Sequence, residues 1–235
     1  MREGSSSRRG RIVLKAVGTG PPACDARGMT RSLVMTLGWW LLGAAVGLVL
    51  GGATSCGQQY LPGGLSSFAN SSGGWTVLTF ATVVVVTRRP SARRWWTAAG
   101  LGLVVFHAAV QGYVVVSTLR GFPDSYGPGD FWFTAATLAG PVIGLAGLWW
   151  WSPRPVLRAA GIAVLAAVMI GDGVSGLVRV AETTGTTWWL ISIAVGVAAL
   201  GWVAVRRLDG WRERALAVGL TAVGAAAFIA VFSVL

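Results

Sequence analysis

The longest charge-free stretch of the chain runs from Ser32 to Thr87, and it limits what the chain can fold into. A soluble domain carries about 25% charged residues, whereas the whole chain of 235 residues carries 11%, together with 54% hydrophobic residues. So few charges cannot coat a water-exposed surface of this size. Because a membrane-spanning helix needs about 20 apolar residues, the chain has room for several such helices and for little else.

Seven apolar runs follow one another along the chain. Since lipid offers no partner for unpaired backbone groups, runs this apolar are expected to be helical. They cover residues 32–54, 66–87, 95–119, 131–151, 159–180, 187–205 and 215–235. The second run is the weakest of the seven, because the polar and small residues from Ser71 to Gly74 interrupt it. The sequence therefore predicts an all-α membrane protein, a bundle of seven transmembrane helices.

The basic residues predict how this bundle is oriented. Seventeen of the 19 Lys and Arg residues lie in the N-terminal tail or in loops 88–94, 152–158 and 206–214, which share one side if all seven runs span. Only Arg120 and Arg179 lie on the other side. Basic loops remain in the cytoplasm, so we expect the N-terminus inside and the C-terminus outside, in the plasma membrane. The same clustering makes the lipid bilayer the expected partner and argues against nucleic acid, despite the net charge of +11.

The first 28 residues differ in composition from the rest of the chain. They are basic, rich in Gly, Ser and Pro, and show no helical periodicity, which predicts a disordered tail before one transmembrane domain at residues 29–235. The membrane pattern begins directly after Met29, so Met29 is an alternative start. Cys24 and Cys56 fall on opposite sides of the first run and are not expected to pair. No metal-ligand spacing is present, and the sequence predicts neither a metal site nor a cofactor.

Several short motifs are typical of one group of membrane proteins. They are the stretch Gly52 to Pro62 (GATSCGQQYLP), Asn70 with Ser71, Arg120 with Gly121, Phe131 with Trp132, Gly140 with Pro141, and the acid within Gly171-Asp172-Gly173. In these motifs the chain, from roughly Met29 to Val180, resembles a family of uncharacterised multi-pass membrane proteins from actinobacteria. That family has no established activity. The resemblance therefore implies the topology and the start at Met29, and it implies no catalytic residues.

Two ionisable residues stand within the predicted spans, where a charge at a helix centre costs about 2.5–3.5 kcal/mol. Asp172 in the fifth run and His107 in the third are expected at similar depths, roughly 18–21 Å from the inner boundary. Gln111 follows His107 by one turn. Ser175 and Arg179 follow Asp172 on the same helix face. These five residues are predicted to form a polar column that opens outward, with Asp172 as its working acid.

Each member of this column also has a purely structural interpretation. His107 alone is more commonly a neutral packing residue, and Arg179 near a helix end can extend to the interface or pair with Glu182. Asp172 is harder to explain by packing alone, because an acid in hydrocarbon needs a partner or a function. Trp188 and Trp189 are expected in an aromatic belt at the outer interface rather than around a ligand.

Three functions remain open at the level of sequence. The first is binding of a small apolar or amphipathic ligand, or proton-coupled transport, through the polar pocket around Asp172. Against transport, the sequence shows no inverted repeat. The second is a membrane-embedded enzyme that acts on a lipid or isoprenoid in the manner of a terpene cyclase, with Asp172 as general acid, an analogy of architecture alone. The third is an accessory protein whose polar groups only pack helices.

Overall fold

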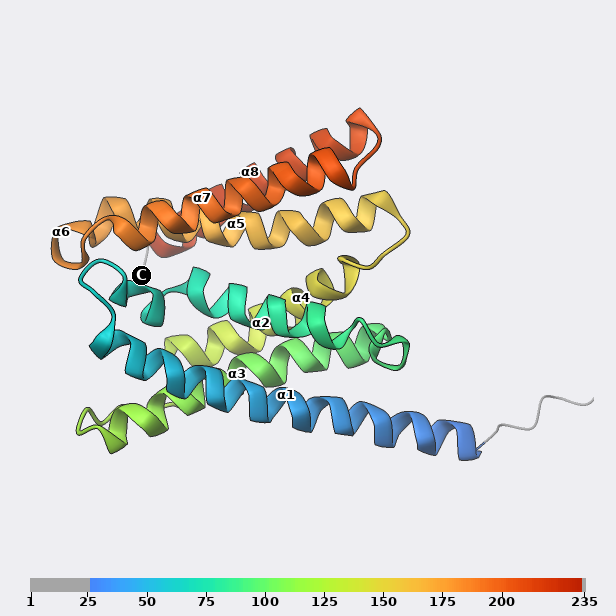
Figure 1. Ribbon diagram of the computed structural model, residues 1–235, viewed down its shortest axis with the longest axis horizontal. Helices are drawn as coiled ribbons and strands as arrows, with labels where there is room; N and C mark the ends of the chain where they lie inside the picture. Colours follow the sequence, from blue (N-terminus) through green and yellow to red (C-terminus); the bar gives the residue numbers. More distant parts are fainter. Residues whose placement is uncertain (1–25, 234–235) are drawn as a thin grey trace, which may run out of the picture.

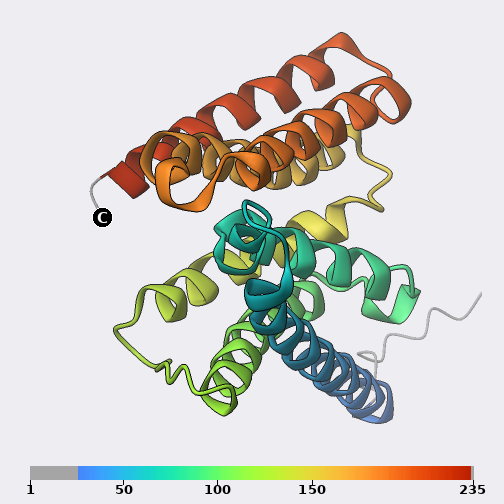
Figure 2. The same cartoon turned by 60° about the vertical axis from the view of Figure 1, so that its left-hand side comes forward.

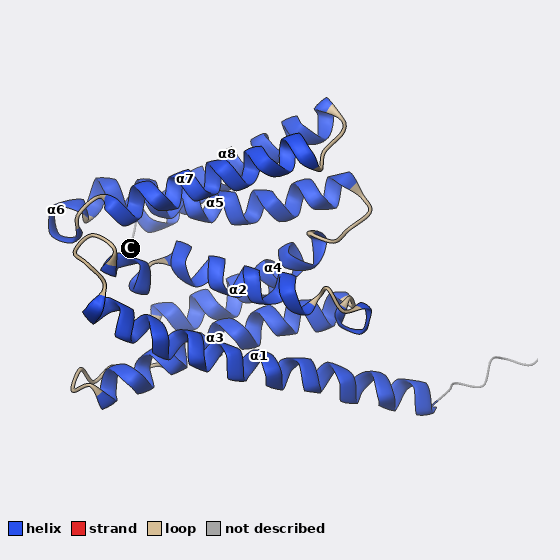
Figure 3. Ribbon diagram, viewed as in Figure 1, coloured by secondary structure: helices blue, strands red, loops and turns tan. Residues whose placement is uncertain are grey.

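The computed structural model describes residues 26–233, and every regular element within them is helical (Figures 1 and 3). Of the predicted tail at residues 1–28, all but the last three residues lie outside the described part of the chain; these three begin the first helix. In chain order the elements are α1 (Ala26–Tyr60), η1 (Ser66–Asn70), α2 (Ser72–Val86), η2 (Pro90–Ala92), α3 (Trp95–Leu119), α4 (Phe131–Trp149), α5 (Pro155–Arg179), α6 (Ala181–Thr184), α7 (Thr187–Arg206) and α8 (Trp211–Ser233).

Six of these helices are long and apolar enough to cross a membrane: the segment Ser32–Tyr60 of α1, and α3, α4, α5, α7 and α8. The expected second span at residues 66–87 does not form one continuous helix. Its first part is the short 3-10 helix η1, and its second part is α2, which has 15 residues. At 1.5 Å per residue α2 is about 22 Å long, shorter than the roughly 30 Å of a hydrocarbon core.

The break between η1 and α2 occurs at Ser71. This residue is extended, with φ −118° and ψ 147°, and its hydroxyl accepts a hydrogen bond from the Gly74 N–H at 2.9 Å. Serine in this position is a favoured helix N-cap, because its oxygen satisfies one of the free N–H groups of the first turn. The residues that interrupt the apolar run therefore start a new helix inside the bundle.

The helices form two groups (Figure 2). In the first group α1 packs along α3, and α3 along α4, with α2 beside them. In the second group α5 packs against both α7 and α8. The groups meet where α2 and α4 face α5, whereas α3 and α5 share no substantial interface. A site at the boundary between the two groups therefore lies next to α2, α4 and α5.

Glycines allow the closest helix contact, between α1 and α3. A Cβ atom at Gly51 would overlap the carbonyl of Ala109, and one at Gly112 would overlap the carbonyl of Leu48. Small residues on facing helices let two backbones approach in this way. The α1–α3 pair therefore forms a closely packed wall of the first group.

The long helices and α2 run back and forth, so that their connections collect at two ends of the molecule (Figure 1). One end holds the loops at 87–94, 150–154 and 207–210, and ten arginines lie in these loops or within four residues of them. The opposite end holds the connections at 61–71, 120–130 and 180–186, next to Arg120 and Arg179. The structure thus has a strongly basic end and an end with few basic residues.

Candidate functional site

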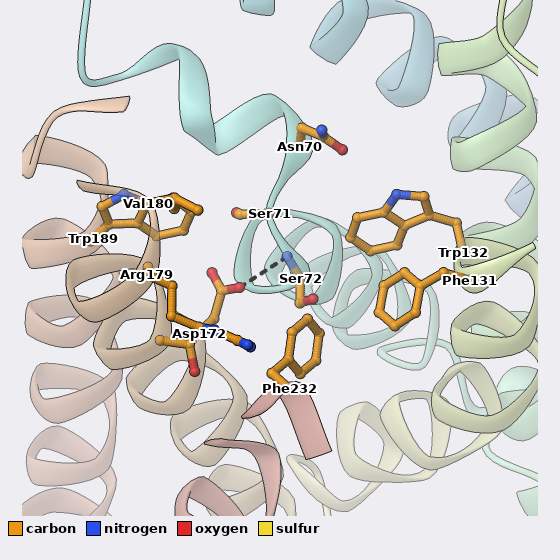
Figure 4. A pocket seen from close by; sticks show the side chains of 12 residues that line it. Asn70, Ser71, Ser72, Phe131, Trp132, Asp172, Arg179, Val180, Trp189 and Phe232 are labelled. Carbon is orange, nitrogen blue, oxygen red and sulfur yellow. Dashed lines mark hydrogen bonds between the residues drawn. The ribbon is translucent and has the colours of Figure 1, made fainter. Parts of the chain in front are cut away.

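Asp172 lies on α5, where α5 meets the start of α2. Its side chain is buried, with 7% of its surface exposed. The Oδ1 atom accepts a hydrogen bond from the backbone N–H of Ser72 at 3.2 Å (Figure 4). Ser72 is the first residue of α2, and a helix N-terminus carries a partial positive charge that stabilises an anion. The carboxylate thus connects the two helix groups.

The second oxygen of this carboxylate has no such partner. Asp172 Oδ2 and Ser175 Oγ, one turn along the same helix, are both buried, and neither makes a hydrogen bond to any residue in the described part of the chain. A Cβ atom at Gly73 would lie 2.9 Å from Oδ2, so glycine leaves space for the carboxylate beside α2. Buried polar atoms are nearly always hydrogen-bonded. Two unpartnered oxygens one helical turn apart therefore mark this position as a candidate site.

A cavity of about 450 Å³ opens beside these oxygens. Residues of α4, α5, α7, α8 and the η1–α2 junction line it, and Figure 4 shows their side chains around the opening. The polar lining residues are Asn70, Ser71, Ser72, Asp172, Ser175 and Arg179, and the aromatic ones are Phe131, Trp132, Trp189 and Phe232. Sites for small molecules typically measure about 300–1,000 Å³ and combine apolar walls with a few polar groups.

Trp188 and Trp189 lie in the first turn of α7, at the helix end where an aromatic belt was expected, but both side chains are buried within the protein. The Trp188 indole N–H donates to Ser71 Oγ at 2.9 Å, which holds the N-cap of α2 in place. The Trp189 indole N–H donates to Thr184 Oγ1 at 3.0 Å, and the ring lines the cavity. Trp189 is therefore part of the cavity wall, and Trp188 stabilises the N-cap residue that lies beside the cavity.

The structure brings together three of the five residues predicted to form the polar column. Asp172, Ser175 and Arg179 line the cavity, as their shared helix face predicted. Arg179 is exposed and makes no ion pair with Asp172 or Glu182 within the described part of the chain. His107 and Gln111 do not line this cavity, because α3, which carries them, does not pack against α5. Gln111 is exposed.

His107 belongs to a separate cluster at the α3–α4 corner. The Tyr126 hydroxyl lies 2.5 Å from Nδ1, and Thr137 Oγ1 lies 3.2 Å from Nε2. The Thr137 hydroxyl donates to the Phe133 carbonyl, so its oxygen accepts from Nε2–H, and Nδ1 accepts from Tyr126. Burial, with a smaller contribution from the charge of Asp130, raises the pKa of Tyr126 to about 12, so the phenol keeps its proton. This network favours the neutral, packing histidine.

A polar cluster that sequence reasoning missed lies at the end of the α1–α3 pair. The Arg120 guanidinium donates to the carbonyl and hydroxyl of Ser55 and, at 2.9 Å from Nε, to Gln59 Oε1. The Tyr113 hydroxyl donates to Gln58. These groups lie around a cavity of about 380 Å³. The signal in the sequence was the pair of motifs 52–62 and 120–121, whose side chains the fold joins here.

Asn70 lines three cavities at this end of the bundle. This exposed residue lines the Asp172 cavity and two neighbouring cavities of about 200 and 290 Å³. Polar residues of the three connections therefore line these three cavities, which share Asn70. Within residues 26–233 no group of three or more His, Cys, Asp or Glu side chains is placed to hold a metal ion.

Comparison with known proteins adds a family but no activity. Neither the curated proteins nor the solved structures include a match to this chain. The model of a family of unknown function, DUF6518, matches residues 29–235. The match continues past Val180 and covers the second helix group as well as the first. Within residues 26–233 all regular elements are helices, and six of them are apolar enough to span a membrane. The chain belongs to DUF6518, a family of unknown function.

Proposed function

We propose that this protein binds a small amphipathic ligand in the cavity beside Asp172. The observation that carries the proposal is the free Asp172 Oδ2, which is buried next to an aromatic-walled cavity and has no partner of its own. A hydroxyl or amine of a ligand would supply the missing hydrogen bond, and its apolar part would lie against Trp132, Trp189 and Phe232. An amine is favoured over an acid because the carboxylate stabilises positive charge.

The experiment compares three probes that share one ring and differ in the polar group: benzylamine, benzyl alcohol and benzoate. Each is added to the purified protein in lipid nanodiscs, and the midpoint of thermal unfolding is measured. We expect benzylamine to raise the midpoint most and benzoate least. In Asp172→Asn this order should disappear, with benzylamine binding weakened about 10-fold or more, the equivalent of a charged hydrogen bond.

Asp124→Asn is the matched control, because Asp124 lies outside the lining of the Asp172 cavity. It should keep the order of the three probes. Two results would contradict the proposal: no probe changes the midpoint, or the order of the probes is unchanged in Asp172→Asn.

Proton-coupled transport is the more specific form of this proposal. The N-terminus of α2 lies inside the bundle, since Asp172, which contacts it, stands about 10 Å from the end of α5. Transporters commonly build their sites from helices that begin within the membrane. If the ligand is carried with a proton, benzylamine uptake into proteoliposomes should follow an imposed pH gradient, and Asp172→Asn should abolish that dependence.

The cavity also supports the second candidate, an enzyme that acts on an isoprenoid. Its aromatic walls would stabilise a carbocation, and Asp172 would be the general acid that protonates a double bond. The test is incubation of the reconstituted protein with farnesol and a search for cyclic products. Formation of such products by the wild type and not by Asp172→Asn would favour the enzyme over the binding protein.

The proposal includes a topology. We propose that η1 and α2 together make the second of seven crossings, which puts the N-terminus in the cytoplasm and the C-terminus outside the plasma membrane. Support comes from the distribution of arginines between the two ends of the structure, because basic segments remain in the cytoplasm. In this orientation the Asp172 cavity opens toward the outer side.

A further inference from the structure

The basic end of the bundle contains a guanidinium with an unmet hydrogen bond. Arg158 lies in the first turn of α5, and its Nε atom is buried without a hydrogen-bond partner among residues 26–233. The first turn of α5 contains no acidic residue, and Arg158 has no ion pair within the described residues. A positive charge at a helix N-terminus is unfavourable, and so is a buried N–H without an acceptor. Both features call for an anion.

A second guanidinium lies at the same end, because α5 packs along α7 and begins where α7 ends (Figure 1). Arg207, directly after α7, is centred 4.9 Å from the Trp150 ring and 6.0 Å from the Trp151 ring. Burial lowers the pKa of Arg207, and the positive charge of Arg158 lowers it further. No carboxylate in the described part of the chain pairs with Arg207. Two guanidinium groups at this end of the bundle therefore have no counterion among the described residues.

The tryptophans place this pair at the level of the lipid head groups. Trp150 and Trp151 follow the end of α4, where the apolar helices of the first group give way to a loop. The Arg88 guanidinium also lies over Trp151, 5.6 Å from the centre of its ring. Tryptophan and arginine at helix ends are typical of the membrane interface, where the anions within reach are lipid phosphates.

We propose that Arg158 and Arg207 together bind the phosphate group of an anionic phospholipid. Guanidinium groups suit this ligand because they donate pairs of parallel hydrogen bonds to phosphate oxygens. The site lies where α4 ends, α5 begins and α7 ends, so the bound lipid joins the two helix groups at the basic end. This inference does not depend on the function proposed for the Asp172 cavity.

The test measures lipid retention and stability of the full chain. Protein in nanodiscs of phosphatidylcholine, with and without phosphatidylglycerol, is compared with Arg158→Gln, Arg207→Gln and the double variant. We expect phosphatidylglycerol to raise the unfolding midpoint of the wild type, and native mass spectrometry to show about 5-fold weaker lipid retention for each guanidinium removed. The double variant should lose the lipid-dependent shift.

Arg212→Gln is the matched control, since Arg212 also lies over a tryptophan at the basic end, 5.7 Å from the Trp211 ring, but has no buried, unpartnered nitrogen. An equal effect of Arg212→Gln would contradict a specific site and indicate general surface charge. The Arg158→Lys, Arg207→Lys variant keeps both charges and should retain the lipid more weakly than the wild type. Retention equal to wild type in this variant, or a full shift with inorganic phosphate in phosphatidylcholine alone, would overturn the proposal of a paired-guanidinium lipid site.

Discussion

The two oxygens of Asp172 have different surroundings, and this difference separates its structural from its functional role. Oδ1 accepts a hydrogen bond from the Ser72 N–H, which is one of the free backbone N–H groups in the first turn of α2. Oδ2 has no partner and lies beside the cavity. A carboxylate that only capped α2 would explain the hydrogen bond of Oδ1. It would not explain why the buried Oδ2 lies beside a cavity without a hydrogen bond to the described residues. We therefore assign the stability of the α2–α5 contact to Oδ1 and ligand binding to Oδ2.

Substitutions at Asp172 test this division. Asp172→Leu should lower the free energy of unfolding by about 1–3 kcal/mol, because the Ser72 N–H is left without an acceptor. Asp172→Asn keeps a carbonyl acceptor and should cost less. Thermal or chemical unfolding in detergent measures both. If Asp172→Leu is as stable as the wild type, the Ser72 N–H does not depend on this carboxylate.

Tyr126 provides a second test at the residue scale. Tyr126→Phe removes the hydrogen bond to His107 and should cost about 0.5–1.5 kcal/mol. The pKa of Tyr126 is about 12, above its usual value of 10.0, so its stabilising effect should be present below pH 10 and lost as the pH rises toward 12. Tyr126→Phe should remove that part of the pH dependence. Tyr60→Phe is the control, because Tyr60 is 76% exposed; an equal loss in both variants would contradict the role of Tyr126.

Among the elements, α2 is the one whose length depends most on its surroundings. It begins at a Ser-Ser-Gly-Gly sequence, beside a carboxylate of another helix and an indole N–H that holds its N-cap. Its shortness leaves room for η1 and for the cavity beside Asp172. The position at which α2 begins is therefore part of the site.

Gly73→Ala tests whether α2 needs glycine at this point. The added Cβ would lie 2.9 Å from Asp172 Oδ2 and 3.0 Å from Ser192 Oγ, so the α2–α5 contact must move. We expect a loss of about 1–3 kcal/mol, as for other overpacked sites, together with weaker benzylamine binding. Gly219→Ala on α8 is the control, since its Cβ would meet nothing within 4 Å. A Gly73→Ala protein as stable as Gly219→Ala would contradict the close contact.

The sequence predicted the apolar helices well because hydrophobic length alone decides them. The run expected at 95–119 is α3 with the same bounds, and the run at 187–205 is α7 within one residue. The sequence did not predict that residues 66–87 divide into η1 and α2, because Asp172 and Trp188, far away in the chain, stabilise the break. Helical periodicity indicated which residues share a face, as for Asp172 and Ser175. It contains no information on which helices are neighbours, so His107 was assigned to the wrong cluster.

The proposed seven-crossing topology of the whole chain can be tested with reporter fusions and thiol labelling. An alkaline phosphatase fused after Leu235 should be active, because seven crossings put the C-terminus outside. The exposed Cys56, near the end of α1, should react in intact cells with a membrane-impermeant maleimide, and Cys56→Ser should lose this labelling. Activity of a cytoplasmic reporter at the C-terminus would instead show that η1 and α2 do not complete a crossing.

Two candidate sites lie along the boundary between the two helix groups, which we call the seam. The Asp172 cavity lies in the seam between the groups, and at the basic end Arg207 of the second group lies over the ring of Trp150, which follows α4 of the first group. Contacts along the seam involve mainly α2, α4 and α5, whereas each group packs more extensively within itself. A ligand or lipid bound in the seam is therefore placed to alter how the groups sit against each other.

Ligand binding beside Asp172 can be observed in a structure of the protein in lipid nanodiscs with benzylamine present. We expect density in the cavity between Trp132 and Trp189, with the amine within hydrogen-bond distance of Asp172 Oδ2. An ion pair between Arg179 and Oδ2, with the cavity closed and empty, would contradict it, because the carboxylate would then have a partner within the protein.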